Sequence, residues 1–246
     1  METDYIIQLI RQKPIDYNGL LILPISFEEI CEEIGLKNFD SMMIPFQLTK
    51  ECIKIEEEFI DDFDIFKHVI LVEENLLYFF CYIIQKFTDC GDITKKGESI
   101  LLYKSKREAN TDEPAMFEIN SDNFDDICEI ILKITGKEKI KVEKEPKNMS
   151  ERQRDVWEKL QAGRKKEAQK NEVHIYDVLN VCEFGGNYHI PIEEIEKWTL
   201  WKIMNCYKAR INIKTYDDSL KICLVSGDGK SISDENHWHN KLMIRD

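Results

Sequence analysis

The chain has 246 residues, of which 43% are hydrophobic and 33% charged, and its formal net charge is −13. This length suffices for one large domain or two small ones with a buried core. The acidic surface disfavours nucleic-acid binding, because phosphate backbones repel it. The nearest candidate for a membrane span, Leu76–Ile84, is too short, and the N-terminus lacks the pattern of a secretory signal. We therefore expect a cytoplasmic protein without a membrane segment.

Eight cysteines are scattered along the chain, and no two of them form a Cys-x-x-Cys pair. The length, the scattered spacing and the missing signal argue against a disulfide framework. A structural zinc site of the usual spacing is also excluded. We interpret the cysteines as free thiols, mostly buried, in a reducing cytoplasm.

The first part of the chain predicts a strand followed by helices. Residues 18–25 are typical of a strand after a turn. Ser26 and Glu29 have the spacing of a capping box, which predicts a helix that ends at Gly35. Residues 42–72 are broken by a proline and an acidic cluster, so only short helices are expected there.

The next elements are a buried helix, a hairpin and a second helix. Glu74–Phe87 is apolar around most of its circumference, which predicts burial. Ser99–Tyr103 and Met116–Ile119 are strand candidates that can pair as a hairpin. Ser121 is the predicted cap of a further amphipathic helix, which ends at Gly136.

The middle of the chain differs in composition. Residues 133–172 are rich in lysine and arginine and poor in apolar side chains, and Ser150 can cap a charged helix that extends to about Lys170. Two interpretations remain open, a solvated linker helix and a basic arm for nucleic acid or a partner. The two signs of charge alternate, which favours the solvated helix.

The last part of the chain is expected to be helical. Apolar residues recur at helical spacing over residues 173–184. A second helix begins at Pro191 and continues through Tyr207 with a broad apolar stripe. This stripe contains Trp198 and Trp201, so both tryptophans are interpreted as core residues.

Together these patterns predict a mainly α fold with a small β component. We expect three parts: an α+β N-terminal domain over residues 1–135, a charged helical linker over residues 136–172, and a helical C-terminal domain over residues 173–246.

The stretch KICLVSGDGKSISDENHWHNKL resembles a phosphate-binding loop at first sight. Gly229-Lys230-Ser231 supplies the end of the GxxxxGK[ST] pattern, but Leu224 stands where the first glycine is required. Too few residues follow to complete a nucleotide fold. We therefore interpret the glycines as a turn, and the preceding residues 217–225 as helical like their neighbours.

His237 and His239 raise the question of a metal site. On a strand they would share one side, but a helix is favoured here, and on a helix they point apart. Only His174 and His189 are near enough in sequence to complete a ligand set. We expect no metal, with Trp238 buried between two surface histidines. Ser-His-Asp and Cys-His signatures are also missing, so the chain is predicted to be non-enzymatic and without a cofactor.

Several stretches resemble a group of proteins from tailed bacteriophages and prophages of Gram-positive bacteria. The similarity rests on NFDDICEIILKI, IYDVLNVCEFGGNYHIPIEEIEKWTLWKIMNCYKA and the closing HWHNKL. In that group a Trp-Thr-Leu-x-x-Ile/Leu-x-x-x-Tyr helix and a terminal His-Trp recur. The opening YNGLLILPISFEEI is similar to the first strand and helix of the group.

The resemblance implies a tail-morphogenesis factor of the tail assembly chaperone kind, which holds the tape measure protein before the tube forms. Such a protein would act in the cytoplasm of the bacterial host and needs no catalytic residue. It needs an apolar helical surface for a partner helix. Candidate partner contacts are the aromatic residues Trp198, Trp201, Tyr207 and Trp238.

Two other functions remain open. The chain can be a structural protein of a phage tail or baseplate, which would stay in the virion. It can also be a nucleic-acid-binding regulator that uses the basic middle helix, although its overall charge makes nucleic acid an unfavoured partner. A homo-oligomer is compatible with each function.

Overall fold

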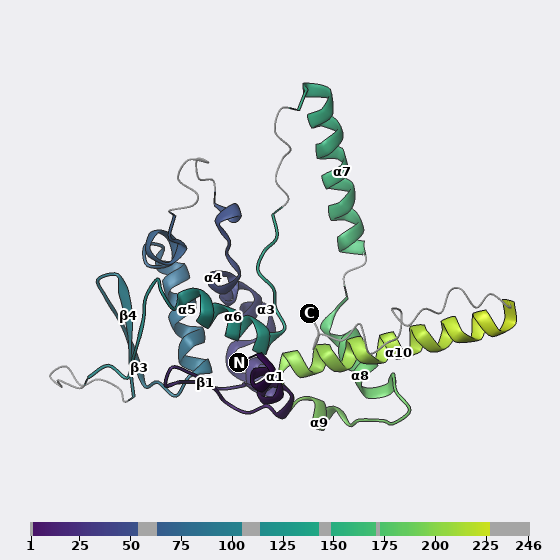
Figure 1. Ribbon diagram of the computed structural model, residues 1–246, viewed down its shortest axis with the longest axis horizontal. Coiled ribbons are helices and arrows are strands. Elements are labelled where there is room, and N and C mark those ends of the chain that lie inside the picture. Colours follow the sequence, from purple (N-terminus) through teal and green to yellow (C-terminus); the bar gives the residue numbers. More distant parts are fainter. Residues whose placement is uncertain (1, 54–62, 105–113, 143–148, 171–172, 227–246) are drawn as a thin grey trace.

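The computed structural model describes residues 2–53, 63–104, 114–142, 149–170 and 173–226. It is 61% helical and 10% strand, which confirms the mainly α fold with a small β component. Figure 1 shows a packed body from which α7 (Glu151–Lys170) and the outer half of α10 (Leu200–Ser226) extend. Within the described residues, none of the helices has the length and apolar character that crossing a membrane requires.

The N-terminus forms α1 (Glu2–Arg11) and an antiparallel hairpin of β1 (Ile15–Tyr17) and β2 (Leu20–Ile22). Asn18 and Gly19 make the turn with φ of 51° and 90°. Positive φ at both central positions is the geometry that joins two twisted strands tightly. The strand expected over residues 18–25 is therefore shorter, and its partner β1 was missed.

The capping box at Ser26 is confirmed. The backbone N–H of Glu29 donates to Ser26 Oγ at 3.2 Å, and the Glu29 carboxylate accepts from the Ser26 N–H at 2.6 Å. The first turn, α2 (Phe27–Glu29), continues as a π-helical turn over Ile30–Ile34 and stops at Gly35 with φ of 80°. Two short helices follow, α3 (Leu36–Met42) and α4 (Ile44–Gln47).

Helix α5 (Glu74–Phe87) has the predicted bounds and lies in the centre of the body. A 3₁₀ turn (Lys50–Cys52) and a π-helical turn (Phe66–Ile70) precede it. The ring of Phe80 is completely buried and lies 4.9 Å from Phe46, 6.3 Å from Phe66 and 5.5 Å from Phe124, measured between centroids. Four elements of the chain thus meet at one aromatic cluster.

A three-stranded antiparallel sheet lies beside α5, in the order β3 (Asp92–Lys96), β4 (Ser99–Tyr103) and β5 (Phe117–Ile119). The expected pairing of Ser99–Tyr103 with the strand that ends at Ile119 is confirmed, with Ile100 opposite Ile119. The sequence did not predict β3, because DITKK is too polar to be recognised as a strand.

Helix α6 (Phe124–Thr135) ends as predicted at Gly136, which has φ of 66°. The predicted cap Ser121 is wrong: Asn123 is the N-cap residue, and the Ser121 hydroxyl is buried without a hydrogen-bond partner in the described part of the chain. In the turn before the helix, the side-chain amide of Asn123 donates to Glu118 O at 2.8 Å.

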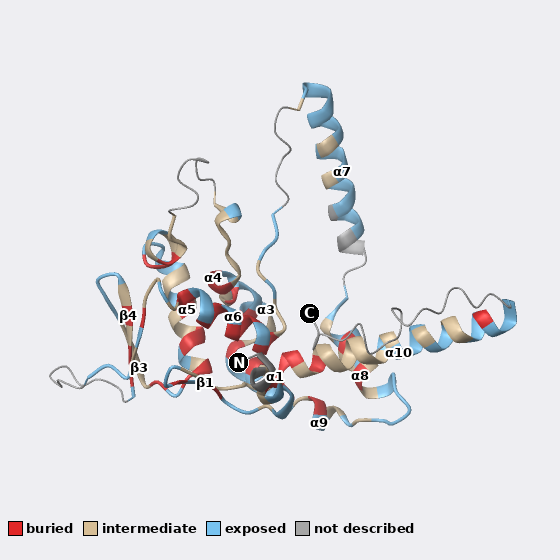
Figure 2. Cartoon of the chain, viewed as in Figure 1, coloured by how far each residue is buried: buried red, intermediate tan, exposed pale blue. Residues whose placement is uncertain are grey.

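Helix α7 (Glu151–Lys170) confirms the charged helix in the middle of the chain. The Gln153 N–H donates to Ser150 Oγ at 3.4 Å, and the Ser150 N–H donates back to Gln153 Oε1 at 2.8 Å, so Ser150 caps the helix as predicted. Figure 2 shows the helix exposed along most of its length. Its described side chains therefore contribute little to the core.

The C-terminal part contains α8 (Ile175–Phe184), α9 (Ile192–Ile195) and α10 (Leu200–Ser226). The prediction of one helix from Pro191 through Tyr207 is wrong, because the chain leaves the helix after Ile195 and re-enters it at Leu200. Thr199 starts the new helix: its hydroxyl accepts from the Lys202 N–H at 3.2 Å.

This break connects the N-terminal and C-terminal parts of the fold. The N–H groups that open α2 donate to carbonyls in the break, Phe27 to Trp198 at 2.8 Å and Glu28 to Glu196 at 2.9 Å. These donors have no partner within their own helix. A single helix through the break would leave both without an acceptor.

The hydrophobic core crosses the expected domain boundary. Val178, Cys182, Trp198 and Trp201 belong to the same buried cluster as the apolar residues of the N-terminal part. Helix α10 also contacts α6 and α1. Residues of both parts thus share one buried cluster, and the division into domains 1–135 and 173–246 with a linker between them stays a prediction.

Candidate partner-binding site

The helix pair α8 and α10 carries the candidate contacts. Helix α8 packs on α10 through Val178 and Cys182, which are spaced one turn apart and are both buried. At the start of α10, Trp201 and Ile203 are buried as well, although they point to different sides of the helix. The inward faces of the two helices are therefore occupied by contacts within the chain.

The predicted contact residues differ in how far they are buried. Trp198 and Trp201 are 9% and 5% exposed, so both lie in the core, and Lys202 Nζ covers the Trp198 ring at 4.5 Å from its centroid. Tyr207 is half-buried and lines a pocket between helices. Trp238 lies outside the described residues, as do the glycine-rich turn at 227–231 and both histidines of the HWH stretch.

The pocket beside Tyr207 lies where α3, the end of α6, the start of α8 and α10 meet. Its volume is about 500 Å³, and most of its wall is apolar. Gly136 forms part of the wall, with Met204 Cγ 3.6 Å from the position of a Cβ there. A hollow of this size fits one or two apolar side chains of a partner.

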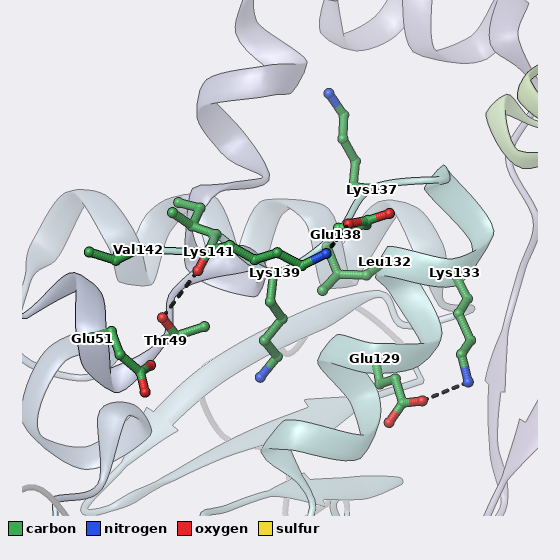
Figure 3. A pocket seen from close by; sticks show the side chains of 11 residues that line it. Thr49, Glu51, Glu129, Leu132, Lys133, Lys137, Glu138, Lys139, Lys141 and Val142 are labelled. Atoms are coloured by element: carbon green, nitrogen blue, oxygen red, sulfur yellow. Dashed lines mark hydrogen bonds and ion pairs between the residues drawn. The ribbon is translucent and has the colours of Figure 1, made fainter. Parts of the chain in front are cut away.

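A second hollow of about 640 Å³ lies between the turn at Thr49 and the extended residues 137–142 (Figure 3). Four of the residues that line it are lysines, which suggests an anion site. Each lysine, however, has a carboxylate partner: Lys133–Glu129, Lys137–Asp40, Lys139–Asp125 and Lys141–Glu138. The positive charges of these four lysines are thus paired with carboxylates of the same chain.

Three aromatic side chains on and after α8 are exposed, and we call them the α8 aromatic face: Tyr176 at 58%, Phe184 at 64% and Tyr188 at 83%. Large aromatic side chains on a surface are typical of protein interfaces.

Arg210 of α10 positions the end of this face. Its Nη1 donates to Val181 O at 3.1 Å and its Nη2 to Tyr188 O at 3.4 Å. A Cβ on Gly186 would come within 2.9 Å of the Arg210 Cζ, so a larger residue there would displace the guanidinium. The loop that carries Tyr188 is therefore fastened to α10.

The surroundings of the face are acidic. Asp177 is exposed beside Tyr176, and α9, which contacts α8, adds the exposed Glu193 and also Glu194, which is paired with Lys197 at 3.7 Å. Farther along, the tip of α10 exposes the aliphatic side chains of Ile222, Leu224 and Val225 at 67%, 83% and 91%. This combination suits a partner with apolar side chains and basic neighbours.

Among the described residues, no group of three or more His, Cys, Asp or Glu side chains is arranged to hold a metal ion. Burial raises the pKa of the Cys81 thiol to about 11, and it raises that of Cys128 as well. The exception is Cys206, between α8 and α10, whose pKa is lowered, whereas the pKa of its neighbour Cys182 is raised.

Comparison with known proteins gives no match to any family model, to any curated protein or to any solved structure. Inferences about function therefore rest on the residues of this chain.

Proposed function

We propose that the protein is a non-enzymatic phage tail assembly factor, which binds a helical segment of the tape measure protein in the cytoplasm of the bacterial host. The observation that carries this proposal is the α8 aromatic face, three exposed aromatic side chains on a surface fastened by Arg210. It supplies the apolar helical surface that a chaperone of this kind needs for a partner helix.

The charges favour a basic, amphipathic helix as the ligand. The chain has a net charge of −13, and Asp177, Glu193 and Glu194 are exposed around the face. Apolar burial would supply most of the affinity, because exposed ion pairs contribute only about 0–1 kcal/mol each. Binding should therefore survive moderate salt.

Coexpression with the tape measure protein of the same phage or prophage tests the proposal. The wild-type chain should raise the soluble yield of that protein and copurify with it. The variant Tyr176→Ser should weaken copurification, whereas Tyr78→Ser should not, because Tyr78 is also 58% exposed but lies on α5. Equal behaviour of the two variants would contradict a role for the α8 aromatic face.

Two outcomes would favour the other functions. Recovery of the protein from purified virions at a fixed copy number would support a structural protein of the tail or baseplate. The basic, exposed α7 motivates a nucleic-acid-binding regulator. A DNA mobility shift that disappears with salt and with charge reversal in α7 would support that function.

A further inference from the structure

Two cysteine side chains meet where α8 packs on α10. Cys182 is fully buried, and its Sγ donates to Ile203 O at 3.4 Å. Ile203 lies one turn before Cys206 on α10, and this spacing places the Cys206 side chain next to Cys182. The two sulfurs are thus neighbours although 23 residues of chain separate them.

Arg210 places a positive charge at this pair. It lies one turn after Cys206 on α10, and its guanidinium donates to Val181 O, the carbonyl next to Cys182. Lys202, one turn before Cys206, adds a second cation. The nearest acid of α8, Glu183, is paired with His189 at 3.2 Å. The charged groups that surround the pair are therefore mainly cationic.

We propose that Cys206 and Cys182 form a peroxide-reactive modification site, in which Cys206 attacks the oxidant and Cys182 converts the product into a disulfide. Cys206 is half-buried and so is the accessible member, whereas Cys182 is enclosed. Partial exposure in cationic surroundings is the usual setting of a reactive cysteine.

The reaction balances with a peroxide as the oxidant. The Cys206 thiolate attacks one oxygen of hydrogen peroxide, the O–O bond breaks, and the departing hydroxide takes a proton to become water. The sulfenic acid on Cys206 is then attacked by the Cys182 sulfur. The S–O bond breaks, and a second water leaves with the Cys182 proton. Two thiols and one peroxide yield one disulfide and two water molecules.

Other thiols of the chain lack these surroundings. The hydrogen bond with Cys182 lowers the pKa of Cys206, and Arg210 and Lys202 act in the same direction against burial. For Cys31 and Cys81, which are also half-buried, burial instead raises the pKa. The reactive fraction at neutral pH should thus be concentrated at Cys206.

The experiment uses the reduced, full-length protein, treated with a small excess of hydrogen peroxide at neutral pH. We expect the intact mass to fall by about 2 Da, and peptide mapping without reductant to link Cys182 with Cys206. The variant Cys182→Ser should instead accumulate a sulfenic acid on Cys206, which dimedone traps. Cys206→Ser should lose the rapid phase, and Cys81→Ser should behave as the wild type.

A second measurement, made on the wild-type protein, keeps the proposal testable if the variants misfold. In the wild type, iodoacetamide should alkylate Cys206 before Cys31 and Cys81, with a pH midpoint below the ordinary thiol value of about 8.5. Arg210→Gln should raise that midpoint, and Arg210→Lys should largely preserve it. A disulfide between other cysteines, no disulfide at all, or a Cys206 midpoint at or above the ordinary value would overturn the proposal.

Discussion

Helices α5 and α7 have the same backbone geometry, but α5 is buried and α7 is exposed, so they are stabilised in different ways. In α5, Phe80, Ile83 and Ile84 are completely buried, so tertiary packing holds the helix. In α7, most described side chains are exposed, and the helix relies on its cap at Ser150 and on its charged residues. The packed body therefore determines the fold, while α7 can change in sequence without disturbing the core.

The largest contrast is expected from truncation of a side chain in each region. Phe80→Ala removes the centre of the aromatic cluster and should lower the free energy of unfolding by about 3–5 kcal/mol. Leu160→Ala in α7 removes a side chain that is 56% exposed and should change it by no more than about 0.5 kcal/mol. Urea denaturation followed by circular dichroism measures both. Similar losses would show that α7 is packed in solution.

Trp201→Ala tests whether the body includes the C-terminal helices. Trp201 is buried in the core cluster that spans both parts of the chain. The substitution should cost about 3–5 kcal/mol and lower a single unfolding transition. Calorimetry distinguishes this from two domains, which would give two transitions with only one of them shifted.

A pair of glycines gives a smaller contrast of opposite sign. Gly136 ends α6 with φ of 66°, a conformation that costs an alanine about 1–2 kcal/mol. Gly163 lies within α7, where a Cβ meets nothing within 4 Å. Gly163→Ala should stabilise α7 by about 1 kcal/mol. Thermal denaturation should show a lower melting temperature for Gly136→Ala and no decrease in melting temperature for Gly163→Ala.

Local signals in the sequence were sufficient for several elements. The capping residues Ser26 and Ser150, the stop at Gly136 and the full extent of α5 follow from rules that act within a few residues. The break after Ile195 could not be predicted in this way. It depends on donors from α2 and on the Gln12 side chain, which accepts from the Thr199 N–H at 2.9 Å across most of the chain length.

In the candidate site, too, some features were predictable from the local sequence and others were not. Burial of Trp198 and Trp201 was predictable from their apolar stripe, and the structure agrees. Their assignment as partner contacts is not supported by that burial. The pairing of Cys182 with Cys206 was not predictable, because no local pattern relates two cysteines on different helices. Periodicity shows which side of a helix is buried, but not what it is buried against.

The smallest contrast compares two serine caps of the same chemistry. Ser26 caps α2 inside the body, and Ser150 caps α7 outside it. Ser26→Ala should cost about 1 kcal/mol and lower the melting temperature by about 2–4 °C. Ser150→Ala loses a cap of similar strength, but the loss only frays the first turn of α7, so the main melting temperature should not change.

Trypsin reports that local fraying directly. Arg152 and Arg154 lie in the first turn of α7, and both are exposed. Because a protease needs an unfolded segment, Ser150→Ala should speed cleavage at these two arginines, whereas Ser26→Ala should leave that rate unchanged. If Ser150→Ala lowered the melting temperature as much as Ser26→Ala, α7 would be coupled to the core, and the contrast between the two helices would fail. A slower cleavage in the presence of the tape measure protein would instead place α7 within the partner interface.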